Sequence, residues 1–227
     1  KRQLEIFTHE HGRHKGLIRG IHSKNLRATI EPGNEVHVNW SGRLESHLGN
    51  FTIEPIKMWS SYILNQRAKL LAVTTICSMI ISTMAEKQQN ILIYEKTLKL
   101  IQDISRGEKD WIKNYIFWEL DLLSEIGYGL DLSECAVTAR RDKLKYVSPS
   151  TGRAVTMEGA GTFKDKLFIL PEFFVDSSID LALADIKNAM GLTEYFFLKR
   201  FYEPNNLNFP KRRNHLKNIL INEDKKY

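Results

Sequence analysis

The chain has few cysteines: Cys77 and Cys135 are the two among its 227 residues. Two cysteines do not make the disulfide framework of a small secreted domain, so we expect a reducing compartment. Residues 1–3 do not have the pattern of a signal peptide. The most apolar run, residues 70–84, is diluted by Thr and Ser and is too short to span a membrane. These features disfavour the secreted disulfide-rich class and the membrane-spanning class.

Catalytic motifs are also missing. The sequence has no P-loop, nucleophile elbow, His-Glu-x-x-His motif or dinucleotide-binding fingerprint. Gly159 and Gly161 lack the strand-to-helix context of a phosphate-binding loop. Glu119 and Asp121 are two residues apart on an expected helix, so they do not share a face; we expect one exposed and one half-buried carboxylate. The sequence therefore predicts a protein that is not an enzyme and that uses no cofactor.

Positive charge is in modest excess and is concentrated at the two ends of the chain. The net charge is +6, from 33 Lys and Arg against 27 Asp and Glu. Residues 1–57 carry nine Lys and Arg against six Asp and Glu, and residues 199–227 carry eight against three. This distribution favours a polyanionic partner, held by two contact surfaces or by one surface assembled from both ends.

The first 57 residues have the pattern of a small β-module. Strands are expected at residues 4–7, 15–21, 36–40 and 48–56, with a basic loop at 23–27 and a tight turn at 31–34. Alternation places Val36, Val38 and Trp40 on one face, which favours a core position for Trp40; a platform for base stacking is the alternative. Short antiparallel strands at this spacing predict a small barrel. A five-stranded barrel needs one more strand, which we expect before residue 1.

After Met58 the pattern becomes helical. Helices are expected at residues 62–86, 91–106, 110–126, 179–190, 193–202 and 211–221. Residues 130–170 interrupt them with a β-hairpin, whose strands are expected at 144–147 and 153–156. The predicted fold class is α+β and multidomain: an OB-like β-barrel at 1–57, then a mainly α-helical domain at 58–227 with a short β-hairpin insert.

Two groups of side chains are candidates for contact with a polyanion. The first group follows a turn, a strand and the loops of the β-module: Arg13, His14, Lys15, Arg19, Lys24, Arg27 and Arg43. The second lies near the end of the chain and could hold phosphates or the acidic tail of a partner: Lys211, Arg212, Arg213 and Lys217. Small barrels often track a phosphate backbone with such cations, although a solvated charged surface is the alternative for both groups.

Three histidines, His9, His11 and His14, lie around one turn. Imidazole is a common zinc ligand, but no cysteine is nearby and the spacing matches no familiar ligand set. We therefore predict no metal here. A metal-dependent hydrolase built on this turn is the weakest of the functional alternatives.

Short segments in a fixed order carry a resemblance to a known family. They lie at residues 9–17, 19–20, 32–34, 40, 47–49, 130–136, 146–149 and 152–155, and they include the run His-Glu-His-Gly-Arg-His-Lys-Gly-Leu at 9–17. In their order and spacing the chain resembles RecO, a family of bacterial DNA repair and recombination mediator proteins. The resemblance spans nearly the whole chain and implies an N-terminal OB-fold followed by a helical domain.

The resemblance also implies a function and partners. RecO-like proteins bind single- and double-stranded DNA, anneal complementary strands coated with single-strand-binding protein, and work with RecR to load recombinase. It implies that the helical domain receives the C-terminal tail of single-strand-binding protein, and that the protein is cytoplasmic and nucleoid-associated. The alternative from another class is a non-catalytic scaffold that binds acidic peptides through a basic helical surface, with a barrel that is only structural.

The chain departs from the family pattern in the insert. Many RecO-like proteins carry a four-cysteine zinc module there, but here Cys135 stands alone and Thr138 takes the place of a second cysteine. One thiolate cannot make a four-coordinate zinc site. We therefore expect a zinc-finger-like insert at about 130–170 that lacks metal ligands and is held by its own packing and hairpin.

Overall fold

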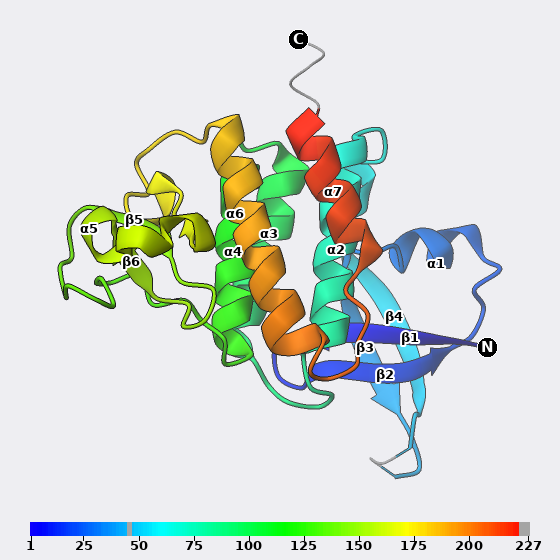
Figure 1. The fold of residues 1–227 in the computed structure, drawn as a ribbon. Helices are drawn as coiled ribbons and strands as arrows, with labels where there is room; N and C mark the ends of the chain where they lie inside the picture. Colours follow the sequence, from blue (N-terminus) through cyan, green and yellow to red (C-terminus); the bar gives the residue numbers. More distant parts are fainter. Residues whose placement is uncertain (45–46, 223–227) are drawn as a thin grey trace. The chain divides into compact units, whose positions relative to one another are not determined.

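The computed structural model describes residues 1–44 and 47–222 (Figure 1). The chain divides into two compact units, one that covers Lys1–Trp111 and one that begins at Ile112. The first unit contains β1 (Arg2–Thr8), β2 (Gly12–Ile18), α1 (Lys24–Thr29), β3 (Glu35–Ser41), β4 (Asn50–Lys57), the 3-10 turn η1 (Trp59–Tyr62), α2 (Arg67–Thr83) and α3 (Ile91–Arg106). None of the helices in the described part of the chain has the length and hydrophobicity needed to cross a bilayer.

The strands of the first unit form one sheet in the order β1-β2-β4-β3. The pairs β1/β2 and β3/β4 are antiparallel, but β2 and β4 are joined through one parallel pair, Leu17 and Asn50. The expectation of antiparallel strands is therefore wrong for this junction. In the described residues β1 and β3 are the two edges of the sheet, so a closed barrel is not formed by these four strands.

The basic loop expected at residues 23–27 is instead the short helix α1. Six residues are too few to show a helical period, so sequence periodicity does not detect this helix. Its C-terminal end is held by Asn34, whose side-chain amide donates to the carbonyl oxygens of Ala28 (2.8 Å) and Thr29 (3.2 Å). The turn at 31–34 therefore fixes the position of α1.

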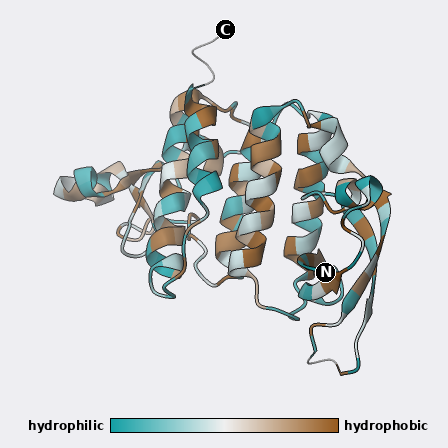
Figure 2. Ribbon diagram, turned by 90° about the vertical axis from the view of Figure 1, so that its right-hand side faces the viewer, coloured by the Kyte–Doolittle hydropathy of each residue, from teal (hydrophilic) through white to brown (hydrophobic). Residues whose placement is uncertain are grey.

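The sequence predicts helices α2 and α3, and in the structure both belong to the first unit. Each buries one apolar face, and hydrophobic and hydrophilic stretches alternate along the helices in Figure 2. The turn at Gly33 contacts both helices, because a Cβ on this residue would lie 2.3 Å from Val73 of α2 and 3.8 Å from Ile101 of α3. The predicted domain boundary after residue 57 coincides with the end of β4, whereas the compact unit extends through α3.

The second unit is mainly helical, with α4 (Trp111–Glu125), α6 (Leu183–Phe196), the π-helical segment η4 (Phe197–Tyr202) and α7 (Lys211–Asn222). The two helices expected at 179–190 and 193–202 form one continuous helical run. Gly191, which lies between the two predicted helices, does not end this run. A single glycine lowers the stability of a helix, but packing of its neighbours can keep the helix continuous. Ile186, Met190 and Phe196 are buried in the unit.

The insert contains the predicted hairpin. Strands β5 (Leu144–Val147) and β6 (Ala154–Thr156) pair antiparallel, and the two-residue strand β7 (Phe168–Ile169) adds to β5. The elements α5 (Met157–Ala160), η2 (Gly161–Lys166) and η3 (Glu172–Phe174) complete it. A small core forms around Cys135, Val155 and Ala160, with Leu144, Tyr146 and Leu167 packed against it.

Candidate nucleic-acid interface

Four cations of the predicted DNA-binding group are exposed in the first unit. Lys24 and Arg27 are on α1, Arg19 precedes this helix, and Arg43 follows β3. Within residues 1–44 and 47–222, none of these four side chains forms an ion pair. Exposed cations without carboxylate partners remain available to bind phosphate. We call Arg19, Lys24 and Arg27 the α1 cations.

Arg13 and Lys15 have carboxylate partners instead. An Arg13 Nη1 donates to Glu5 at 2.7 Å, and its Nε donates to the carbonyl oxygen of Met84 at 2.9 Å. The Lys15 ammonium lies 3.2 Å from the Glu86 carboxylate. These contacts join strand β2 to the segment after α2. Arg13 and Lys15 therefore hold the first unit together, and we leave them out of the proposed DNA surface.

The Lys15–Glu86 pair shifts the ionisation of Glu86. Burial opposes the charged form of this carboxyl, but the hydrogen bond from Lys15 and the charges of Lys15, Arg13 and Lys87 outweigh it. The pKa of Glu86 therefore lies below its ordinary value of 4.5. The carboxylate is ionised across the neutral range.

This pair makes stability depend on pH in the acid range. Because folding lowers the pKa of Glu86, the stabilisation is complete above the ordinary value of 4.5 and is lost as pH falls through the folded-state pKa. Urea unfolding at about pH 7 and about pH 3 should show a smaller loss of unfolding free energy for Glu86→Gln than for the wild type. Glu54 is exposed and forms no ion pair among the described residues, so Glu54→Gln is the control. If Glu86→Gln loses as much unfolding free energy between these two pH values as the wild type does, the prediction is wrong.

His14 is half-buried beside aromatic rings rather than on the surface. Its ring centroid lies 5.7 Å from that of Trp40 and 5.7 Å from that of Phe51. Burial, together with the charge of Lys87, holds the pKa of His14 below its ordinary value of 6.5. We infer a packing role for this imidazole and leave it out of the proposed DNA surface.

Trp40 is fixed by the loop that follows β3. Its indole Nε1 donates to the carbonyl oxygen of Leu48 at 3.1 Å. Gly49 has a φ of +63°, and a Cβ there would lie 2.2 Å from the indole nitrogen. The loop therefore encloses a half-buried ring, which agrees with packing better than with stacking on a base.

The structure divides the C-terminal cationic group. Lys211 and Arg212 are exposed and form no ion pair among the described residues. Lys217 pairs with Glu194 at 2.7 Å. Arg213 is completely buried, with an exposed fraction of 0%. The predicted partner contact by Arg213 does not fit this burial, so Lys211 and Arg212 remain the candidates in this group.

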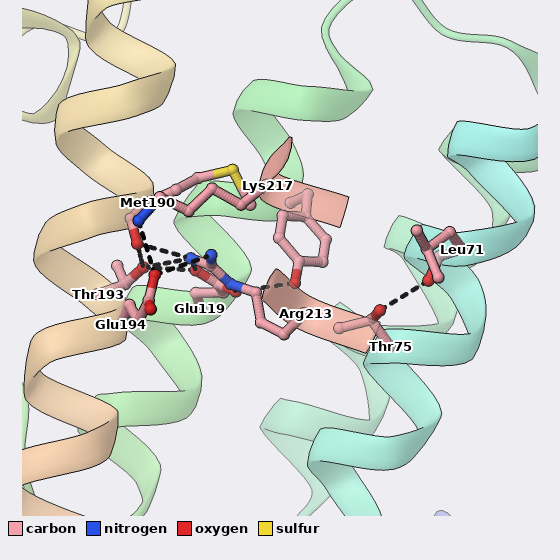
Figure 3. A network of polar contacts seen from close by, with 9 residues as sticks. Leu71, Thr75, Glu119, Met190, Thr193, Glu194, Arg213 and Lys217 are labelled. Carbon is pink, nitrogen blue, oxygen red and sulfur yellow. Dashed lines mark hydrogen bonds and ion pairs between the residues drawn. The ribbon is translucent and has the colours of Figure 1, made fainter. Parts of the chain in front are cut away.

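Arg213 is the centre of a buried polar network in the second unit (Figure 3). Its Nε donates to Glu119 Oε1 at 2.6 Å and its Nη2 donates to Glu119 Oε2 at 2.8 Å. The hydroxyl groups of Tyr115 and Thr193 also donate to this carboxylate, at 2.8 and 2.5 Å. Burial opposes the charge of Arg213, but Glu119 outweighs it and raises the Arg213 pKa. Glu119 is therefore fully buried, unlike the exposed or half-buried carboxylate that its spacing predicts.

Cys135 accepts several hydrogen bonds within the insert. Its Sγ is 3.4 Å from the backbone nitrogens of Val137 and Thr138 and 3.2 Å from that of Thr156. Burial opposes a thiolate here, but hydrogen bonds from Thr138 and Thr156 outweigh it and lower the Cys135 pKa to about 6. These donors hold the Cys135 sulfur inside the small core of the insert.

The structure does not gather the three N-terminal histidines into a metal site. His9 faces Glu95 at 3.8 Å, His11 faces Glu10 at 3.9 Å, and His14 packs against aromatic rings. Across the part of the chain that is described, no group of three or more His, Cys, Asp and Glu side chains is placed to hold a metal ion.

Comparison with known proteins identifies matches along most of the chain. The family model for the N-terminal region of recombination protein O matches residues 1–59, and the model for its C-terminal region matches residues 64–206. A protein of Hyphomonas neptunium named DNA repair protein RecO is 38% identical over 215 residues, which cover 94% of this chain and 88% of the relative. A protein of the same name from Cereibacter sphaeroides is 35% identical over 193 residues, covering 85% and 79%.

Proposed function

Because the chain belongs to the RecO family of DNA repair proteins, we propose that it binds single- and double-stranded DNA and anneals complementary strands. We propose a non-enzymatic role as a recombination mediator that helps to load recombinase. The observation that carries the proposal is the set of exposed cations on and beside α1, which have no carboxylate partners among the described residues.

The proposed mechanism is electrostatic. Two complementary strands repel each other through their phosphates, and cations that bind both backbones lower that repulsion. The α1 cations and Arg43 supply this charge from the first unit. Such contacts are independent of base sequence, which suits a protein that must act on any pair of complementary strands.

The proposed partners are single-strand-binding protein and RecR. An acidic tail would find complementary charge at Lys211 and Arg212, which are exposed near the start of α7. Docking of the tail would bring the chain to coated strands. The alternative of a scaffold that binds only acidic peptides uses the same two residues but predicts no annealing.

We also propose that a fifth strand closes the sheet into an OB-like barrel. The edges of β1 and β3 border a cavity of about 710 Å³, which α2 and α3 also line. Leu4 and Ile6 of β1 and Val36 and Val38 of β3 contribute to its lining. An extended strand that paired with both edges would direct alternate apolar side chains into this cavity.

The function is tested by annealing of complementary strands across a salt series, with and without single-strand-binding protein. We expect the chain to accelerate annealing at low salt and to lose this effect as salt rises, because phosphate contacts are displaced by counterions. Binding to an acidic peptide without any acceleration of annealing would support the scaffold alternative and contradict the proposal.

A further inference from the structure

Two cations and two aromatic rings meet in the first unit, outside the predicted DNA-binding group. Lys57 ends β4, Trp59 and Tyr62 lie on η1, and Arg106 lies in the last turn of α3. The Lys57 Nζ is 5.4 Å from the ring centroid of Trp59 and 5.3 Å from that of Tyr62. The Arg106 guanidinium is 5.4 Å from the Trp59 ring, and the two rings are 6.1 Å apart. We call these four residues the η1 cluster.

One aromatic ring of the cluster is buried and hydrogen-bonded, and the other is half exposed. Trp59 is 6% exposed, and its indole N–H donates to Glu35 at 3.3 Å. The backbone N–H of Ser60 donates to the side-chain oxygen of Asn34 at 2.9 Å, which ties η1 to the turn after α1. Tyr62, in contrast, is 52% exposed. A half-exposed ring on an anchored turn can receive a planar ligand without a large loss of conformational entropy.

Positive charge exceeds negative charge at the cluster. The Lys69 ammonium adds positive charge at the end of α3, since it lies 3.2 Å from the position of a Cβ on Gly107, the residue after Arg106. Among the described residues, Lys57, Lys69 and Arg106 form no ion pair with a carboxylate. Glu35 is the carboxylate that contacts the cluster, and it accepts from the Trp59 indole. Cations that lie over aromatic rings keep their charge, so they can still bind an anion.

We propose that the η1 cluster binds single-stranded DNA, with an unpaired base stacked on Tyr62 and the flanking phosphates held by Lys57, Lys69 and Arg106. An aromatic face beside several cations is the arrangement that single-strand binders use. A base inside a duplex has both faces covered by its neighbours, so Tyr62 selects the single strand. The inference rests on the proposed function, because it assumes that the chain binds DNA.

The position of the cluster extends the proposed surface. Lys57 is seven residues after Asn50 along β4, so the cluster lies about 23 Å from the end of the β3–β4 ribbon that carries Arg43. Asn34 links α1 to η1 by hydrogen bonds to both. Asn34 therefore connects the C-terminal end of the helix that carries Lys24 and Arg27 to the turn that carries Tyr62.

The aromatic part of the site is tested by Tyr62→Leu, which removes the flat ring and keeps an apolar side chain. We expect the affinity for a single-stranded oligonucleotide to fall about fivefold or more, with duplex affinity within about twofold of wild type. Tyr128 is 36% exposed in the second unit, and Tyr128→Leu is the matched control. An oligonucleotide carrying 5-iododeoxyuridine should form a photo-crosslink to Tyr62 in the wild-type chain, which mass spectrometry can locate.

The cationic part is tested by the double variant Lys57→Gln and Arg106→Gln. It should weaken both single-strand and duplex binding and lower the salt dependence of each. The inference is overturned if Tyr62→Leu binds the single-stranded oligonucleotide as tightly as the wild type and the wild-type chain forms no crosslink at Tyr62. It is also overturned if Tyr62→Leu loses duplex affinity as strongly as single-strand affinity. If the cluster variants lose affinity for an acidic peptide but keep wild-type affinity for DNA, the cluster binds a protein and the inference is wrong. A wild-type chain that binds no DNA contradicts the proposed function itself.

Discussion

Reversal of the three α1 cations in one variant, Arg19→Glu with Lys24→Glu and Arg27→Glu, is expected to weaken duplex binding at low salt by about tenfold or more. All three side chains are exposed and form no ion pair among the described residues. Removal of three phosphate contacts should reduce the log–log salt slope by about 2.7 for a duplex, because each contact contributes about 0.9. Binding titrations at several salt concentrations measure both quantities, and annealing should slow in parallel.

The control must separate the position of the charges from the change in net charge. Lys164, Lys166 and Lys187 are exposed lysines of the second unit, and their reversal to Glu changes the net charge by the same amount. We expect this variant to retain most of the wild-type affinity and slope. An equal loss in both variants would show that net charge, rather than the α1 surface, controls binding.

Local sequence pattern is sufficient to predict most of the secondary structure. The β5–β6 hairpin follows from two short β-rich runs around a turn that contains Gly152. Helix α3 follows from its apolar period and from Gly107, whose φ of +77° ends the helix. In contrast, α1 is too short for a period, and the parallel pair between β2 and β4 depends on how distant strands meet. These two features require tertiary information.

The candidate sites show the same limit more clearly. Residue type alone places Arg13 and Arg27 in one group, but Arg13 pairs with Glu5 whereas Arg27 is exposed. The η1 cluster joins residues from β4, η1 and α3, which no local pattern connects. Helical spacing places Arg213 and Lys217 on one face, and this spacing correctly predicts neighbours. It does not predict that the face is turned toward the buried Glu119, which is 94 residues away in the sequence.

That burial makes Arg213→Met the substitution with the largest expected effect on stability. Met has a similar length, but it leaves Glu119 charged, buried and without a cation. Loss of one partner of a buried ion pair costs about 3–5 kcal/mol. Tyr115 and Thr193 still donate to Glu119, but neutral hydroxyl groups do not balance its charge. Urea unfolding should therefore show a strongly reduced free energy of unfolding.

The adjacent residue offers a matched control, since Arg212 is exposed on the same helix. Arg212→Met should change the unfolding free energy by no more than about 0.5 kcal/mol, as is usual for surface substitutions. The double variant Arg213→Met with Glu119→Leu should recover much of the loss, because an apolar pair needs no buried charge to be balanced. If Arg213→Met instead keeps wild-type stability and weakens DNA or peptide binding, its guanidinium must be accessible, which contradicts the buried pair. Within this network, therefore, unfolding and binding measurements distinguish a stabilising arginine from a contacting one.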